Sequence, residues 1–176
     1  MKVTLNELLK AALMIAIGVV LPIAFHALGW TGRVFLPMHI PVLLAGFILG
    51  PWLGVTVGAT TPLLSSLLTG MPPMAPMPIA LQMSVELAAF GLLAGVLYTK
   101  LKLHIVPSLL LTLVGGRFVF SLVTLAVFPL LGLRAVPLAQ VFGASLVMAL
   151  PGLALQLVAV PATVLILQRH GQARQK

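Results

Sequence analysis

Residues 78–98 read PIALQMSVELAAFGLLAGVLY, an apolar run with a single carboxylate, Glu86, near its middle. A run of ~20 apolar residues is long enough to cross a bilayer as a helix. A carboxylate at that depth is strongly disfavoured unless it is paired or protonated. The chain has only two acidic residues, and the other, Glu7, lies near the N-terminus, where water or lipid headgroups can reach it. Glu86 therefore marks a polar site inside a membrane-embedded segment.

The composition of the whole chain agrees with a membrane protein. Hydrophobic residues make up 61% of the sequence, charged residues 7%, and the mean hydropathy is +1.21. Soluble domains are usually ~25% charged, so a water-soluble fold is excluded. The apolar runs are continuous and do not alternate as the strands of a membrane β-barrel do. We predict an all-α integral membrane protein in which residues 1–176 form one domain, a compact bundle of six transmembrane helices.

Glycine, proline and charged residues divide the chain into the six predicted spans. These spans cover approximately residues 5–28, 36–49, 53–68, 79–98 and 105–128, and a last one that begins after Pro137 and ends near Gln168. The last span is longer than a ~30 Å hydrocarbon core requires, so its first turns lie outside the core or bend at Pro151. The first span follows Lys2 and Lys10 as a signal peptide would, but its apolar run is long for a cleavable one, and we expect it to be retained.

The distribution of lysine and arginine predicts the orientation. With an even number of spans, both termini lie on the same side of the membrane. Cytoplasmic loops carry an excess of Lys and Arg, so we expect both termini in the cytoplasm, and only Arg33 and Arg134 fall on the opposite side. The cations on the expected cytoplasmic side are Lys2, Lys10, Lys100, Lys102, Arg169, Arg174 and Lys176. The net charge of +8 is thus an orientation signal, and no basic stripe with interleaved aromatic residues indicates nucleic acid.

Polar residues within the spans predict a binding pocket that faces outward. Counted from the outer ends, Glu86 lies ~12 Å deep and Arg117 ~16 Å deep, so the two can pair. Gln82 precedes Glu86 by four residues and shares its helix face, and His39 lies near the outer end of the second span. We predict a pocket that gathers His39, Gln82, Glu86 and Arg117.

The same residues also fit purely structural roles. The pair of Glu86 and Arg117 could be a structural clamp alone, and His39 could be a core residue whose hydrogen bonds are satisfied. We expect Gln140 and Gln156 to form hydrogen bonds between helices. The sequence TGMPPMAPMP, residues 69–78, is either a rigid connector or a lid over the pocket.

Neither an enzyme nor a metal protein is indicated. No spacing of His, Asp and Glu suggests a metal site, and Ser65 and Ser66 lack an evident activating base. Cysteine is absent, which removes thiolate ligands and nucleophiles. We expect no catalytic residues and no cofactor.

Small residues recur at intervals of four. Ala12 and Ala16 form such a pair in the first span, Gly91 and Gly95 form another, and a longer series comprises Gly46, Gly50, Gly54 and Gly58. Stripes of this kind let helix backbones approach closely in lipid. We expect the glycines to serve packing inside the bundle, whereas the alanines could contact a partner protein.

These residues together resemble a known family, the substrate-binding S components of energy-coupling factor (ECF) transporters. The stretch LPMHIPVLLAGFILGPWLGVTVGATTPLLSSLLTG, residues 36–70, is similar to their second and third spans. The matching positions are Pro41, Leu43, Leu44, Gly46, Gly50, Pro51 and Gly54. The pair of Ala12 and Ala16 resembles their small-residue docking stripe, and GGRFVF around Arg117 is similar to a Gly-Arg found in their fifth span.

The resemblance implies a function and a set of partners. Such a protein captures a small water-soluble vitamin or precursor outside the cell and docks on a transmembrane T component that carries two cytosolic ATPases. Ala12 and Ala16 would then form the docking face, in the cell membrane of a prokaryote. The chain has no G-x-x-x-x-G-K-[ST] motif for ATP, which agrees with energy supplied by partner chains.

The ligand class follows from the expected pocket residues. A carboxylate, a guanidinium, an amide and an imidazole suit a small polar heterocycle or a small acid, of the size of pyridoxine, hydroxymethylpyrimidine, pantothenate or niacin. Two Trp and one Tyr make a pocket for a large ring system less suitable. Two other functions stay open: a membrane scaffold or assembly protein with no ligand, and a small proton-coupled transporter that uses Glu86 as its proton carrier.

Overall fold

The computed structural model describes residues 3–27, 35–130, 132–133 and 145–173, and in these residues the secondary structure is helical throughout, without strands. Two π-helical segments, η1 and η2, continue helices α5 and α6. The elements are α1 (Leu5–Ala27), α3 (His39–Leu49), α4 (Pro51–Thr69), α5 (Ile79–Gly95), η1 (Val96–Lys100), α6 (Ile105–Leu122), η2 (Val123–Val127), α7 (Phe128–Leu130) and α8 (Ser145–Ala173).

The helices follow the segments predicted from the sequence to within a few residues. The second helix begins at His39 and not at Leu36, whose φ of 48° takes it out of the helix. The last helix begins at Ser145 and continues through Pro151 and Pro161 to Ala173. Arg33, Arg134, Gln140 and the start of the last predicted span lie outside the described residues.

The length and the surface of the helices indicate a multi-pass membrane protein. Among the described residues, four helical segments are long and apolar enough to cross a bilayer: Leu5–Phe25, Ile79–Lys100, Ile105–Leu130 and Val147–Gln168. Between the first two, α3 is an apolar helix of 11 residues and α4 has 19 residues. Large apolar side chains face outward, with Leu67 79% and Leu130 86% exposed. Surface of this kind is unfavourable in water and is matched by lipid.

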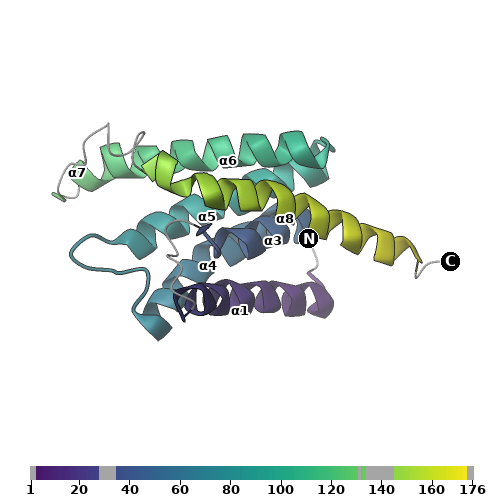
Figure 1. Ribbon diagram of the computed structural model, residues 1–176, viewed down its shortest axis with the longest axis horizontal. Coiled ribbons are helices and arrows are strands. Elements are labelled where there is room, and N and C mark those ends of the chain that lie inside the picture. The colour runs from purple at the N-terminus through teal and green to yellow at the C-terminus, as the bar shows by residue number, and fades with distance from the viewer. Residues whose placement is uncertain (1–2, 28–34, 131, 134–144, 174–176) are drawn as a thin grey trace.

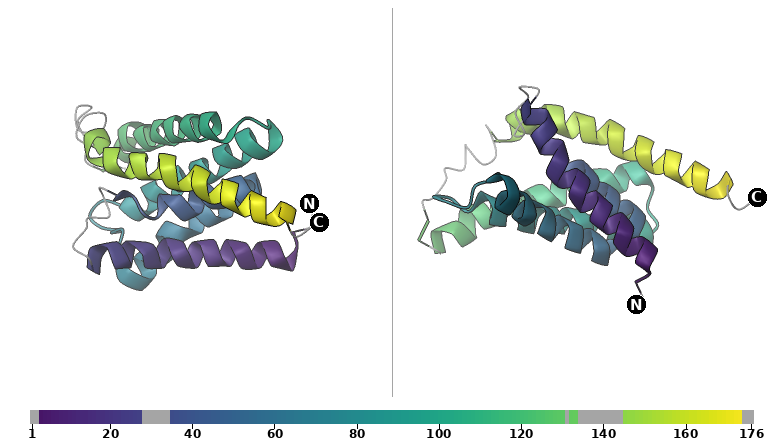
Figure 2. Two further views of the ribbon diagram at one scale, coloured as in Figure 1. Left: turned by 45° about the vertical axis from the view of Figure 1, so that its right-hand side comes forward. Right: turned by 90° about the horizontal axis from the view of Figure 1, so that it is seen from below.

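The helices form a bundle with α1 and α6 on opposite sides (Figure 1). Helices α3, α4 and α5 lie between them, and α8 packs against α3 and α6. The start of α1, the turn at residues 101–104 and the end of α8 share one end of the bundle, which we call the terminal end (Figures 1 and 2). The loop at residues 70–78 and α7 lie at the other end, the loop end.

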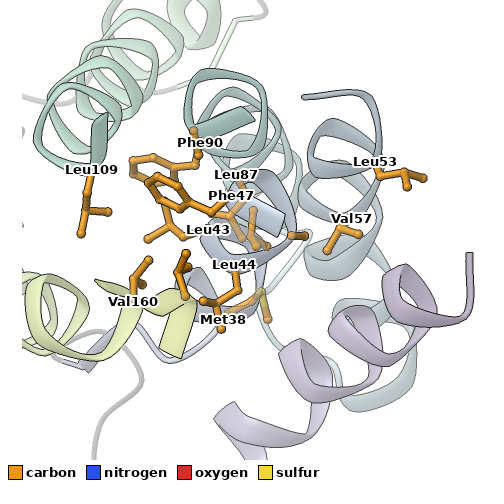
Figure 3. Packing of buried hydrophobic residues seen from close by; sticks show 14 of the residues in the cluster. Met38, Leu43, Leu44, Phe47, Leu53, Val57, Leu87, Phe90, Leu109 and Val160 are labelled. Carbon is orange, nitrogen blue, oxygen red and sulfur yellow. The ribbon is translucent and has the colours of Figure 1, made fainter. Parts of the chain in front are cut away.

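Helix α3 lies at the centre of the hydrophobic core. Its residues Val42, Leu43 and Ala45 are fully buried. Around them pack Phe90 of α5 and Val160 of α8, together with side chains from α4 and α6 (Figure 3). The polar residues of α3 and α5 are therefore held on helices whose positions are fixed by the core.

Glycines set the close contact between α4 and α5, as expected for the small-residue stripes. A Cβ atom added at Gly54 would lie 2.5 Å from the carbonyl oxygen of Gly91, and one added at Gly46 would lie 2.7 Å from the same oxygen. Gly50 has a φ of 85°, which few residues other than glycine adopt. It turns the chain directly from α3 into α4.

Candidate functional site

Glu86 and Arg117 form an ion pair between α5 and α6. Arg117 Nη1 lies 3.3 Å from Glu86 Oε1, and the two side chains are 21% and 3% exposed, respectively. The pairing predicted from the sequence is thus confirmed. A buried carboxylate needs such a partner, because an uncompensated charge in an apolar bundle is costly.

The pair leaves much of its hydrogen-bonding capacity unused. Glu86 Oε1 accepts no hydrogen bond, and Arg117 Nε and Nη2 have no hydrogen-bond partner. The guanidinium also lies over the ring of Phe120, with 5.7 Å from Cζ to the ring centroid. An arginine presents five donors in a planar fork, so the Nε and Nη2 edge of Arg117 remains free for an acceptor that the described residues do not supply.

His39, the first residue of α3, is buried beside this pair. Its ring packs edge-on against Phe90, with 5.3 Å between the ring centroids. Phe90 lies one turn beyond Glu86 on α5, and Arg117 is close enough to His39 to interact with it electrostatically. Both ring nitrogens of His39 lack a hydrogen-bond partner. His39 is therefore not a core residue whose hydrogen bonds are satisfied within the protein, which was the structural alternative.

Gln82 already has a partner within the protein. Its Nε2 donates to Thr124 Oγ1 on η2, and Thr124 in turn donates to the carbonyl oxygen of Phe120 at 2.8 Å. Gln82 therefore ties α5 to the continuation of α6, one turn from Glu86. Its predicted contact with a ligand stays a prediction.

Gln156 of α8 is a candidate site residue to which the sequence analysis gives a different role, hydrogen bonding between helices. It is completely buried, and neither its Nε2 nor its Oε1 has a hydrogen-bond partner. The prediction that it forms a hydrogen bond between helices is therefore wrong. Val160, one turn along α8, packs into the core against α3 (Figure 3), which places Gln156 on the buried face of its helix. A glutamine inside an apolar span was the available signal, but whether its amide is satisfied depends on the neighbouring helices.

Unsatisfied polar groups thus come from four helices that pack on one another. We call His39, Glu86, Arg117 and Gln156 the polar cluster; they lie on α3, α5, α6 and α8. The hydroxyl groups of Ser108 and Thr112, nearer the start of α6, also have no hydrogen-bond partner. Buried polar atoms in native proteins are nearly always hydrogen-bonded. Groups without partners can form hydrogen bonds with a molecule that enters between the helices. Among the described residues, no three of His, Cys, Asp and Glu are grouped to hold a metal ion.

Ala12 and Ala16 lie on the outside of the bundle. Both are exposed on α1, whereas Ala11 and Val19 of the same helix are buried. The side chain of Thr61 on α4 would be 2.6 Å from a Cβ added at Gly18. The small-residue face with Ala12 and Ala16 is therefore distinct from the face by which α1 packs on its own bundle.

An all-helical membrane domain with unsatisfied polar groups between its helices has the features of a membrane transport component. The chain matches the family model described as ECF transporter, substrate-specific component, over residues 6–164, and it belongs to that family. The match includes all four residues of the polar cluster and confirms the resemblance drawn from the sequence. Members of this family are substrate-binding components of transporters and not a known class of enzyme. Neither the curated proteins nor the solved structures contain a match to the chain.

Proposed function

We propose that the protein is the high-affinity binding subunit of an ECF-type importer for a small water-soluble vitamin or precursor. It would cross the plasma membrane of a prokaryote six times, with both termini in the cytoplasm. The observation that carries this proposal is the polar cluster, whose buried donors and acceptors lack partners. Membership of the substrate-specific component family supports it.

Each group of the cluster suits a part of such a ligand. The free edge of the Arg117 guanidinium can bind a carboxylate or a polarised oxygen through two hydrogen bonds. The amide of Gln156 offers a donor beside an acceptor, which fits an amide or an N–H and C=O edge. Glu86 holds Arg117 in place and can accept a hydrogen bond from a ring N–H or a hydroxyl group.

The free arginine edge favours acids among the candidate ligands. Pantothenate and niacin carry a carboxylate that can form two parallel hydrogen bonds with Arg117. Pyridoxine and hydroxymethylpyrimidine offer hydroxyl groups and ring nitrogens, for which His39 and Gln156 are the better partners. We therefore place pantothenate and niacin first, and the two uncharged heterocycles second.

Delivery of the ligand into the cell would need partner chains. In this family the substrate-specific component works with a T component and ATPase subunits in the membrane. We propose that Ala12 and Ala16 form the contact with the T component, because their exposed small side chains allow another helix to approach closely. Two cytosolic ATPases would then supply the energy.

The proposal is tested by identifying what the protein carries. The full chain is purified from cells in mild detergent and denatured, and the released small molecules are identified by mass spectrometry. We expect one vitamin-sized compound that rebinds to the protein without ATP. Its uptake into vesicles should require the T component and hydrolysable ATP. If the chain alone takes up the compound and a proton ionophore stops the uptake, the protein is the proton-coupled transporter instead. If no compound is bound or transported, the protein is the scaffold.

A further inference from the structure

A cavity with both polar and apolar lining residues lies at the terminal end of the bundle, away from the polar cluster. Its volume is about 400 Å³, and it lies between the end of η1, the start of α6 and the end of α8. Arg117 is 12 residues further along α6 than Ile105, which lines this cavity. At 1.5 Å per residue that is a separation of ~18 Å, so the cavity is a separate site.

The polar side chains of the cavity wall include one cation and several groups that can donate hydrogen bonds. Tyr98, Lys102, His104 and Gln168 line it. Gln168 Nε2 donates to Tyr98 Oη at 2.5 Å, so the tyrosine hydroxyl keeps its own proton to donate. The ring of Tyr98 is positioned by an edge-on contact with Phe47, at 5.2 Å between centroids.

Lys102 is held at this wall by the backbone of the turn. Its φ of 53° is rare for a residue other than glycine, asparagine or aspartate. Backbone hydrogen bonds fix the turn on either side: Leu101 N donates to Val96 O at 2.9 Å, and Leu103 N donates to Leu97 O at 3.1 Å. The turn thus holds Lys102 in a backbone conformation that is unfavourable for lysine. We infer that the position of its side chain is constrained.

Within the described part of the chain, no carboxylate pairs with the cations of the turn. The sequence holds two acidic residues, Glu7 and Glu86. Glu86 is paired with Arg117 inside the bundle. Glu7 accepts hydrogen bonds from the backbone and side chain of Thr4 on the side of α1, opposite α6 (Figure 1). An external anion can therefore act as a counterion for Lys102, the cation that lines the cavity.

The rest of the lining is apolar and partly exposed. Leu103 and Leu165 belong to the cavity wall and are 37% and 49% exposed. A phosphate with acyl chains attached matches a basic, donor-rich wall beside apolar side chains at the end of membrane helices. We propose that this cavity binds the phosphate headgroup of an anionic phospholipid in the leaflet at the terminal end.

The test uses the full chain in mild detergent with added phosphatidylglycerol, phosphatidylcholine or inorganic phosphate. Bound lipid is counted by native mass spectrometry, and the shift in thermal midpoint is measured against lipid concentration. We expect phosphatidylglycerol to bind and to raise the midpoint, with smaller effects from phosphatidylcholine and from phosphate. Asparagine tolerates the left-handed backbone, so Lys102→Asn removes the charge without adding strain. This variant should bind phosphatidylglycerol ~10-fold more weakly, because it loses a charge-assisted contact.

Two control variants make the result decisive. Lys102→Arg keeps the charge and should retain binding, and Lys10→Gln removes an exposed cation from α1 at the same end of the bundle and should leave it unchanged. All variants should unfold at the same temperature as the wild type when no lipid is added. The proposal is overturned if Lys102→Asn binds phosphatidylglycerol as tightly as Lys10→Gln does. It is also overturned if phosphatidylcholine or inorganic phosphate stabilises the protein as much as phosphatidylglycerol.

Discussion

Glu86 and Arg117 depend on each other unequally, because their surroundings differ. The Glu86 side chain is 3% exposed, whereas that of Arg117 is 21% exposed. An arginine that loses its partner can move its charged head to a more exposed position, because its side chain is long and flexible. A carboxylate at the position of Glu86 has no such route. The ion pair therefore protects Glu86 more than it protects Arg117.

This asymmetry predicts the order of stability among the variants of the pair. Arg117→Met leaves an unpaired buried carboxylate and should lower the free energy of unfolding by ~3 kcal/mol. Glu86→Gln should cost less than Arg117→Met, and the double variant should recover part of the loss. Thermal and denaturant unfolding in detergent measure these differences. Equal losses from both single variants, adding up in the double variant, would show that the two side chains do not interact.

Gln82 and Gln156 are predicted to respond in opposite ways to the same substitution. Gln82→Leu removes the hydrogen bond to Thr124 and should destabilise the free protein by ~1 kcal/mol. Gln156→Leu removes an amide that has no partner, so the stability of the ligand-free protein should be unchanged or higher. Unfolding of the two variants without ligand is the measurement. A clear loss of stability in Gln156→Leu would mean that its amide is satisfied within the protein.

The same residues show how far a single sequence can predict the site. Glu86 and Arg117 stand out because each is a charge within an apolar run, and their pairing followed from comparable depths. The free amide of Gln156 could not be predicted, because satisfaction of a buried group depends on neighbours from other helices. Gln82 illustrates this, since its partner Thr124 is 42 residues away in the chain.

At the scale of helices, the contact between α4 and α5 relies on the absence of side chains. A Cβ at Gly91 would overlap the backbone of Gly54, which cannot move without separating the two helices. Gly115 of α6 differs, because its close neighbour is the flexible end of Leu93, 2.5 Å from an added Cβ. The two glycines therefore form a matched pair for substitution.

We predict that Gly91→Ala lowers the free energy of unfolding by ~1–3 kcal/mol, as overpacking against a fixed backbone does. Gly115→Ala should cost clearly less, since the tip of Leu93 can change rotamer. Thermal midpoints of the two variants in the same detergent provide the comparison. If Gly115→Ala is the more damaging, the close contact between α4 and α5 is not as described.

The helices themselves were largely predictable, because apolar runs and their glycine and proline boundaries are local signals. Helix α3 begins three residues later than the sequence predicts, since nothing in LPMHIP marks the backbone change at Leu36, whose φ is 48°. The π-helical segments η1 and η2 were not predicted either. They arise where α5 and α6 continue with a different hydrogen-bond pattern, for which the sequence has no simple signature.

For the whole molecule, the exposed face of α1 is the proposed connection to the transport machinery. Ala12→Trp or Ala16→Trp should leave ligand binding intact and abolish uptake with the T component and ATPases, because a bulky side chain prevents close helix approach. Val114→Trp places the same side chain at a position of α6 that is 69% exposed, and should allow transport. Uptake into vesicles by each variant is measured beside ligand binding. Normal transport by the alanine variants would show that the docking face lies elsewhere.

The central claim is that the polar cluster binds a small ligand. The most direct test measures the thermal midpoint of the wild type and of Gln156→Leu in the presence of each member of a panel of vitamins and precursors. One compound should raise the midpoint of the wild type, since a ligand at 100 times its Kd stabilises the native state by ~2.7 kcal/mol. The shift should be largely lost in Gln156→Leu, while Leu157→Ala, a change at a neighbouring residue that is 39% exposed, should keep it. A shift of equal size in wild type and Gln156→Leu would contradict the assignment of the polar cluster as the binding site.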